Sequence, residues 1–397
     1  MDFSRREFLK ASLACASCIL VSPAVSRSQG LLGRSGQSGA GNLGKHLALF
    51  YTKLDGKRVR CELCPRGCVV PAGARGYCRV RENQEGEYYS IVYARPCTAH
   101  VDPIEKKPLY HFLPGTSAFS LAAAGCNMHC KFCQNWQISQ PKPEELENFA
   151  LSPDECVSEA KRAGAPSIAL TYTEPIVYYE YTIDIAQAAR ASNVKTVVIS
   201  AGYIQSKPLE KLLEHLSAIK IDLKSFDDGY YQRICDTTLA PVLDTLKTIK
   251  ASGVWFELVN LVLPTLNDSD DEHKRMFEWL MKNLGPSVPL HLTRFHPMYR
   301  LQNLPPTPIS TLERLHALAK NVGLKFPYIG NVPSDPASNT YCPKCEKELI
   351  IRRGFAIRNV GIVSSKAVNK SVCKFCGESI PGKWSLPEMQ EEKVKVG

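Results

Sequence analysis

The sequence predicts an α/β protein in which helices cover a parallel β-sheet. Two observations point to this class. In the middle of the 397-residue chain, apolar runs alternate regularly with amphipathic stretches, and the apolar runs are almost continuous. Continuous apolar strands are buried on both faces, and their alternation with helices indicates a parallel sheet. Such a sheet is either open and doubly wound or an incomplete barrel, and periodicity alone does not choose between the two.

Six strands and five helices are expected in this region. The strands are rich in β-branched and apolar residues and cover residues 118–124, 167–171, 196–200, 218–223, 254–262 and 288–295. The helices have the period of an amphipathic helix and cover residues 153–163, 176–191, 207–216, 228–251 and 270–283. The first helix has a clear start signal, with Ser152 as N-cap and Pro153 at the first helical position.

Composition excludes several other classes. Hydrophobic residues make up 44% of the chain and charged residues 22%, which rules out wholesale disorder, collagen and coiled coil. No apolar run approaches the roughly 18 to 20 residues of a membrane-spanning helix, so an integral membrane protein is excluded. The abnormal value is the count of 16 Cys, because a core of this size holds together without disulfides.

Eleven cysteines form three groups with the spacing of metal sites. The groups are Cys61, Cys64, Cys68 and Cys78; Cys126, Cys130 and Cys133; and Cys342, Cys345, Cys373 and Cys376. The single residues Cys97, Cys156 and Cys235 are expected to be small buried hydrophobic side chains. The two four-cysteine segments carry the excess basic charge. Cations stabilise thiolate metal sites, and no nucleic-acid-binding motif accompanies this charge, so nucleic acid is not the expected partner.

The central group carries the strongest chemical signal. Its Cys-x3-Cys-x2-Cys spacing places three thiols on one loop, directly after the first expected strand. Three cysteines leave the fourth iron of a four-iron cluster open, and a loop at the carboxyl end of a parallel strand is where such folds place their chemistry. Zinc bound by the three cysteines and His129 is the alternative.

With Phe132 between its last two cysteines, this loop resembles the signature of radical S-adenosylmethionine (SAM) enzymes. Residues 50–385 resemble the radical SAM proteins related to pyruvate formate-lyase-activating enzyme, and more closely the AmmeMemoRadiSam-system enzymes. The other matching segments are residues 61–68, 102–108, 171–175, 221–224, 260–264 and 294–297. The resemblance implies a partial (β/α)6 TIM-type barrel with a small Cys-rich module at each end. It also implies a [4Fe-4S] cluster on the three loop cysteines, with SAM chelating the open iron.

The resemblance also implies which residues contact SAM. Thr173 and Glu174 stand where relatives have a Gly-Gly-Glu-Pro motif at the SAM amino group, and both glycines are missing here. Ser200 is expected at the ribose, where Ala201 replaces an Asn that often follows in relatives. The full set of expected SAM contacts is Phe132, Thr173, Glu174, Ser200, Asp222, Lys224, Asn260 and His296.

The implied activity is radical chemistry. A reduced cluster gives one electron to SAM, and the resulting 5′-deoxyadenosyl radical abstracts hydrogen from a substrate. An electron donor such as flavodoxin or ferredoxin is implied, and the substrate could be a protein, as for an activating enzyme, or involve AmmeMemo-system partners. The alternative is a protein that bound metal ions stabilise and that binds a partner or nucleic acid, with a non-catalytic barrel. The missing glycines and Asn keep this alternative open.

The spacing of the C-terminal cysteine group favours one metal, whereas that of the N-terminal group does not. The C-terminal group has two Cys-x2-Cys pairs flanking a β-rich run, which is typical of a zinc ribbon or a rubredoxin-like module. Structural Zn²⁺ is expected there, and a single iron or disulfides are the alternatives. The N-terminal group has the spacing Cys-x2-Cys-x3-Cys-x9-Cys and could hold zinc or an auxiliary iron–sulfur cluster.

The N-terminus resembles a twin-arginine export signal. Arg5 and Arg6 precede a short, weakly apolar stretch that also contains Cys15 and Cys18. Export to the periplasm is expected, with a cytoplasmic enzyme that keeps its leader as the alternative. The expected organisation is a signal at 1–26, a Gly/Ser linker at 27–45, an N-terminal four-Cys module at 46–110, the barrel at 111–335, a zinc-ribbon-like module at 336–385 and a tail at 386–397.

Overall fold

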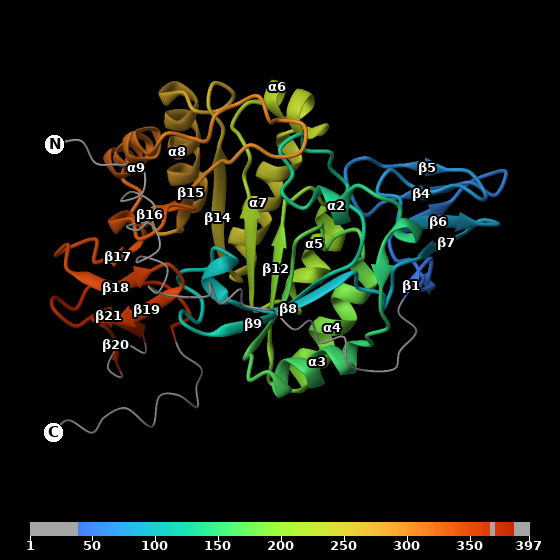
Figure 1. Ribbon diagram of the computed structural model, residues 1–397, viewed down its shortest axis with the longest axis horizontal. Helices are drawn as coiled ribbons and strands as arrows, with labels where there is room; N and C mark the ends of the chain where they lie inside the picture. Colours follow the sequence, from blue (N-terminus) through green and yellow to red (C-terminus); the bar gives the residue numbers. More distant parts are fainter. Residues whose placement is uncertain (1–38, 366–369, 385–397) are drawn as a thin grey trace, which may run out of the picture. The chain divides into compact units, whose positions relative to one another are not determined.

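The computed structural model describes residues 39–365 and 370–384. They belong to one compact unit, Ser35–Gly397. The expected export signal, Cys15 and Cys18, most of the expected linker and the C-terminal tail lie outside the described residues. An eight-stranded sheet forms the centre of the described structure (Figure 1), with the strand order β16-β15-β14-β13-β12-β11-β9-β8.

Seven strands of this sheet run parallel and follow one another in chain order. They are β9 (Ser117–Ala122), β11 (Ser167–Leu170), β12 (Lys195–Ser200), β13 (Ala218–Asp222), β14 (Trp255–Val262), β15 (Leu290–Arg294) and β16 (Pro327–Gly330). β8 (Thr98–Pro103) pairs antiparallel with β9. The two edge strands, β8 and β16, are not paired with each other. The sheet is therefore an incomplete barrel, which confirms the predicted fold class.

Two strands of the sheet were not expected from the sequence. β16 is only four residues long and is bounded by Pro327 and Gly330, which are typical of loops. β8 contains Asp102 and Pro103 and lies at the edge of the sheet, where proline is tolerated because one side of the strand has no partner. The six strands that were expected all form, within a few residues of the expected ends.

Helices connect successive strands. They are α3 (Pro153–Arg162), α4 (Tyr179–Ala191), α5 (Ser206–Leu213), α7 (Ala240–Ser252), α8 (Asp270–Leu284) and α9 (Ile309–Val322). The start of α3 is as expected: Ser152 Oγ accepts a hydrogen bond from the backbone N–H of Glu155, whose carboxylate accepts from the backbone N–H of Ser152. None of the described helices is long and apolar enough to cross a membrane.

The prediction of one helix over residues 228–251 is wrong, because this segment forms two separate helical parts. α6 (Asp228–Tyr230) runs into a π-helical turn at Tyr231–Cys235, and α7 begins only at Ala240. The carbonyl groups of Ile234 and Cys235 accept hydrogen bonds from the backbone of the cysteine loop. These carbonyls are therefore not available to continue the helix, and a tertiary contact overrides the helical period.

The two faces of the sheet have different neighbours. Ile219 and Ile221 of β13 belong to the large apolar core that also contains the buried faces of the helices. Ala218 belongs to a small cluster with Ile104, Phe112 and other residues of the segment after β8. Because side chains alternate along a strand, Lys220 and Asp222 share the inner face with Ala218. The inner face therefore becomes polar toward the carboxyl end of β13.

Small sheets form the Cys-rich modules. The N-terminal module contains β2 (His46–Leu47), β3 (Tyr51–Lys53), β4 (Val59–Cys61), β5 (Val69–Val70), β6 (Arg81–Gln84) and β7 (Glu87–Ser90). The C-terminal module contains β17 (Thr340–Tyr341), β18 (Glu348–Arg353), β19 (Ala356–Asn359), β20 (Ile362–Ser365) and β21 (Lys370–Cys373). The remaining elements are β1 (Gly39–Ala40), β10 (Glu147–Asn148), α2 (Trp136–Ser139) and three short 3₁₀ turns at Ile104–Lys106, Pro143–Glu145 and Pro336–Ser338.

Buried polar contacts hold both modules against the barrel. In the N-terminal module, Arg81 forms a two-pronged ion pair with Glu180 of α4, at 2.9 and 3.0 Å. In the C-terminal module, the backbone carbonyl of Pro381 lies 2.7 Å from Nδ1 of the buried His111, whose Nε2 contacts the hydroxyl of Tyr328. Each module is therefore tied to the barrel by contacts that water does not screen.

Candidate active site

The cysteine loop follows β9 and is held by the π-helical turn. The backbone N–H of His129 donates to Cys235 O at 3.2 Å, and that of Lys131 donates to Ile234 O at 2.9 Å. Cys130 and Cys235 are both buried, and each thiol influences the pKa of the other. The expectation that Cys235 is a small buried residue is therefore confirmed, but its place beside Cys130 was not foreseen. The position of Cys235 depends on the π-helical turn, which the sequence pattern does not predict.

The spacing of the three loop sulfurs does not suit a single metal ion. Among the described residues, only the C-terminal cysteines bring three or more possible ligand atoms within 4.8 Å of one another. Four sulfurs bound to one zinc at about 2.3 Å lie roughly 3.8 Å apart. The sulfurs of Cys126, Cys130 and Cys133 do not all approach this closely. A larger iron–sulfur cluster does not require such close sulfurs, because each cysteine binds a different iron.

His129 is not free to complete a zinc site. Its Nδ1 lies 2.6 Å from the hydroxyl of Tyr77, and its Nε2 lies 2.9 Å from a guanidinium nitrogen of Arg79. Burial and the neighbouring Arg79 lower the pKa of His129 to about 4. Both ring nitrogens are therefore committed to neighbouring side chains. This contact pattern removes the alternative in which His129 is the fourth zinc ligand.

Asp222 lies between two lysines next to the loop. Its carboxylate pairs with Lys220 and lies 3.5 Å from Lys224 Nζ, which in turn lies 5.5 Å from the centre of the Phe132 ring. Burial alone would raise the pKa of Asp222, but the opposite effect of the two lysines is larger. The pKa is therefore below its usual value, and Asp222 stays ionised. Lys220 was not among the expected SAM contacts. The signal was present, since Lys220 and Asp222 are two residues apart in one strand and so share one of its faces.

Glu174 and Ser200 are brought together as expected of neighbouring strand ends. Glu174 Oε1 accepts a hydrogen bond of 2.8 Å from Ser200 Oγ, and Oε2 accepts one of 2.9 Å from the backbone N–H of Ala201. Burial raises the pKa of Glu174, although these hydrogen bonds oppose the shift. The hydroxyl of Thr173 donates to Ala123 O at 2.7 Å. This hydrogen bond joins the turn before Glu174 to the segment that follows β9.

Tyr172 adopts the backbone conformation that a glycine would favour. Its φ is 68°, in the left-handed region, and it directly precedes Thr173 and Glu174. Its hydroxyl donates to Asp102 and accepts a hydrogen bond of 3.1 Å from Lys107, while its carbonyl accepts from Asn135 of the cysteine loop. Tertiary contacts thus hold a turn at which the resemblance predicts glycine. Asp102 and Lys107 belong to a segment that the resemblance marked without giving it a role.

The last two expected SAM contacts lie in β14 and just after β15. Asn260 is buried; its amide nitrogen donates to Leu223 O at 2.8 Å, and its Oδ1 lies 3.2 Å from His273 Nε2. His296 is exposed just after β15. Within residues 39–365 and 370–384, no hydrogen bond joins either side chain to Glu174 or to the loop cysteines.

The C-terminal cysteines have the geometry of a closed metal site. Cys342 Sγ lies 3.5 Å from Cys376 Sγ, and Cys345 Sγ lies 3.7 Å from Cys373 Sγ. All four sulfurs lie within 4.8 Å of one another. These distances match a tetrahedral ion with four thiolate ligands, so this group could bind a metal.

Comparisons with known proteins found one family model and several similar proteins. The model of the radical SAM superfamily matches residues 121–278. The chain is 46% identical over 333 residues to the uncharacterized protein MJ0808 of Methanocaldococcus jannaschii, covering 84% of this chain and 98% of that protein. It is 24% identical over 175 residues to the pyruvate formate-lyase-activating enzyme of Clostridium pasteurianum, covering 43% and 72%. A solved radical SAM methyltransferase from Sphaerobacter thermophilus aligns with a TM-score of 0.46 and 13% identity, over 72% of this chain and 76% of that chain.

The fold and the cysteine loop define a radical SAM protein, and the chain belongs to the radical SAM superfamily. More particularly, it is a homologue of MJ0808, and its relatives include pyruvate formate-lyase-activating enzymes. Membership of the superfamily implies a [4Fe-4S] cluster and SAM.

Proposed function

We propose that this protein is a radical SAM enzyme whose cluster is held by Cys126, Cys130 and Cys133. The observation that carries the proposal is the placement of three thiols after β9, too widely spaced for one metal ion and next to Glu174 and Lys224. When bound, the cluster supplies one electron that breaks the S–C5′ bond of SAM into methionine and a 5′-deoxyadenosyl radical, which takes a hydrogen atom from the substrate.

The residues at the strand ends would bind and orient SAM. Glu174 is an acceptor suited to the SAM amino group, and Ser200 fixes this carboxylate from the next strand. Lys224 supplies a cation for the methionine carboxylate, and Asp222 supplies an anion for the amino group. Burial opposes the charge on Lys224, but Asp222 and the nearby thiols raise its pKa well above the usual range, so Lys224 is charged.

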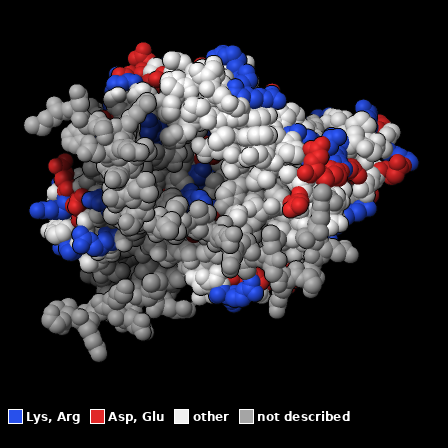
Figure 2. Space-filling model, viewed as in Figure 1, with Lys and Arg blue, Asp and Glu red and all other residues white. Residues whose placement is uncertain are grey.

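The inner face of the barrel would receive the substrate. Figure 2 shows Lys and Arg side chains at the bottom of a hollow on the face in view. Lys107 and Lys220 are both buried, each beside an aspartate. We take the substrate to be a protein, by analogy with the activating enzymes among the relatives. AmmeMemo-system proteins are the proposed partners, and a flavodoxin or ferredoxin is the proposed electron donor.

Two further assignments rest on the sequence. The C-terminal thiols would hold structural Zn²⁺, because their spacing suits a tetrahedral ion and no position is left open. Arg5 and Arg6 would direct export to the periplasm, which suits a protein that is translocated after folding with its cofactor.

SAM cleavage by anaerobically purified protein tests the function. After chemical reduction, the wild-type chain should release 5′-deoxyadenosine and methionine, and Cys130→Ala should release neither, because the cluster loses one of its three protein ligands. Cys156→Ala is the matched control, since this buried thiol contacts Tyr181 and lies outside the three groups. A colourless protein that carries zinc alone and leaves SAM intact would overturn the proposal and favour a metal-stapled binding protein.

A further inference from the structure

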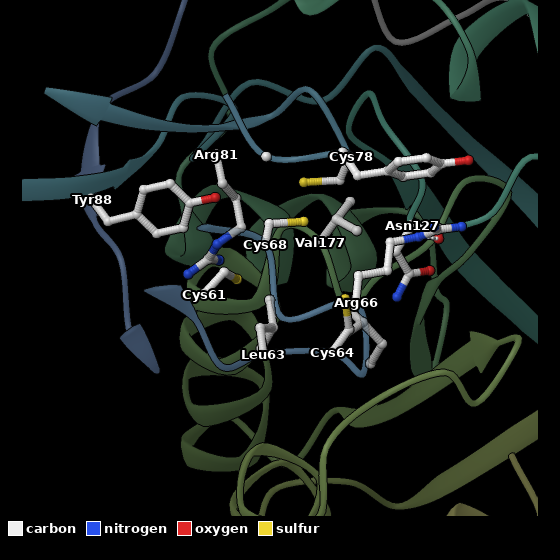
Figure 3. A pocket seen from close by; sticks show the side chains of 13 residues that line it. Cys61, Leu63, Cys64, Arg66, Cys68, Cys78, Arg81, Tyr88, Asn127 and Val177 are labelled. Atoms are coloured by element: carbon white, nitrogen blue, oxygen red, sulfur yellow. Dashed lines mark hydrogen bonds between the residues drawn. The ribbon is translucent and has the colours of Figure 1, made fainter. Parts of the chain in front are cut away.

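We propose that Cys61, Cys64, Cys68 and Cys78 hold a second iron–sulfur cluster of the [4Fe-4S] type, not zinc. All four side chains line one cavity (Figure 3). The cavity is small, with about 20 Å³ in which the centre of a water-sized sphere fits. Four thiols around one space are the ligand set of either metal site, so the choice depends on their spacing and on what else lines the cavity.

The sulfur spacing separates the two cysteine-rich modules. In the C-terminal module, four sulfurs lie within 4.8 Å of one another, as a zinc ion requires. In the N-terminal module, no three of the four sulfurs meet this limit, and the same holds for the loop that carries the catalytic cysteines. A cubane cluster binds each cysteine through a different iron, so its thiolates are held far apart. Like the catalytic loop, the N-terminal module therefore lacks the close sulfur spacing of the zinc-like group.

Buried donors without a partner line the same cavity. The hydroxyl of Tyr88 and Nε of Arg81 have no hydrogen-bond partner among the described residues, and both side chains are at most 1% exposed. A buried donor that lacks an acceptor destabilises the folded state. A cubane cluster brings inorganic sulfides that accept such hydrogen bonds, in addition to the cysteine sulfurs. A zinc ion brings no acceptor of its own. The two donors therefore fit the larger group.

The cavity adjoins the catalytic loop. Asn127, the residue after Cys126, lines it, and its backbone carbonyl accepts a hydrogen bond of 2.7 Å from Arg66 Nε. A Cβ atom on Gly125 would lie 2.8 Å from the carbonyl oxygen of Cys78, so the two loops pack with backbone in contact. Two reduced clusters at these positions would be near neighbours. Their electron spins should therefore interact, which provides a second readout that zinc cannot produce.

Metal and sulfide analysis tests the proposal on the full-length chain after anaerobic reconstitution with iron and sulfide. The wild type should contain about eight iron and eight sulfide per chain, and Cys126→Ala/Cys130→Ala/Cys133→Ala should keep about four of each. Adding Cys64→Ala and Cys78→Ala to that triple variant should remove the remaining iron. A triple variant that is colourless and holds zinc at the N-terminal site in addition to the C-terminal metal would overturn the proposal.

Controls separate loss of the cluster from loss of the fold. Cys156→Ala should keep all of the iron, and every variant should keep the C-terminal metal and an unchanged circular dichroism spectrum. If the triple variant does not fold, the wild type still decides: about four iron in total, with no broadening of the electron paramagnetic resonance signal by a second spin, defeats the proposal. The outcome does not depend on SAM cleavage. A triple variant that retains iron while the wild type fails to cleave SAM would refute the proposed function and leave this cluster intact.

Discussion

The hydroxyl of Tyr172 donates a hydrogen bond to the buried carboxylate of Asp102, on the antiparallel edge strand β8. This contact holds Tyr172 at a φ of 68°, where an ordinary residue is strained by about 1 to 2 kcal/mol. Lys107 Nζ donates to the Asp102 carboxylate and to the Tyr172 hydroxyl. The turn that leads into Glu174 is thus formed by a tyrosine that contacts from other segments hold in place, where the resemblance predicts glycine. The missing glycines therefore do not imply a lost turn.

We expect Tyr172→Phe to lower the free energy of unfolding by about 1 to 3 kcal/mol, since Asp102 and Lys107 lose a buried hydrogen-bonding partner. The apparent affinity for SAM should fall as well, because the turn before Glu174 loses its anchor. Denaturant unfolding and SAM titration of the reconstituted protein measure the two effects. Tyr89→Phe, at a partly exposed tyrosine in the N-terminal module, is the control. Unchanged stability and SAM affinity in Tyr172→Phe would show that the contact is incidental.

The ion pair between Arg81 and Glu180 should couple the N-terminal module to α4. Both side chains are 1% exposed, so Arg81→Met leaves an unpaired buried carboxylate and should cost about 3 to 5 kcal/mol. Arg81→Met/Glu180→Leu removes both charges and should be more stable than Arg81→Met alone. Denaturant unfolding of the two variants and the wild type measures the difference. Equal destabilisation of the single and double variants would argue against a buried charge pair.

The stability of the protein should depend on Lys107 in alkaline solution. Burial lowers the pKa of Lys107 from 10.5 to about 8, although Asp102 opposes the shift. Between these two values the unfolded chain binds more protons at this residue than the folded chain, so the free energy of unfolding should rise with pH. Lys107→Met should reduce this slope between about pH 8 and 10.5. Identical slopes for the variant and the wild type, measured by denaturant unfolding at several pH values, would rule out a shifted pKa.

Loss of one C-terminal thiol should affect the module and spare the barrel. Cys376→Ala opens a closed site whose metal contributes folding free energy on the order of 10 kcal/mol. The variant should lose the metal and become sensitive to proteases after Tyr341, while it keeps its iron and cleaves SAM. Zinc analysis, limited proteolysis and the SAM cleavage assay give the three readouts. Loss of SAM cleavage from a variant that still holds its C-terminal metal would contradict the separation of the two sites.

Export should require Arg5 and Arg6. Changing both to Lys should trap the protein in the cytoplasm with its leader attached, because the twin-arginine pathway recognises the arginine pair. Cell fractionation followed by N-terminal sequencing measures both properties. Lys10→Arg keeps the arginine pair and the charge, and serves as the control. The same distribution for the double variant and the wild type would favour a cytoplasmic enzyme that retains its leader.

The barrel and the catalytic loop could be predicted because their signals are local. Strands such as β12 and β13 are continuous apolar runs, and the spacing of Cys126, Cys130 and Cys133 lies within eight residues. β16 was missed because four residues between a proline and a glycine carry too little pattern. The long helix expected over 228–251 failed because periodicity cannot show that the cysteine loop takes up two of its carbonyl groups.

By itself, the sequence determined the α/β class, the order of the strands and the three groups of cysteines, because residue spacing and hydrophobic period act over a few residues along the chain. Only the tertiary structure decided which group of sulfurs lies close together, that Arg81 pairs with Glu180, and that Asp102 contacts Tyr172 in its left-handed conformation. These relationships join residues separated by tens of positions. Their distances follow from how strands and loops pack, and a spacing in sequence does not encode them.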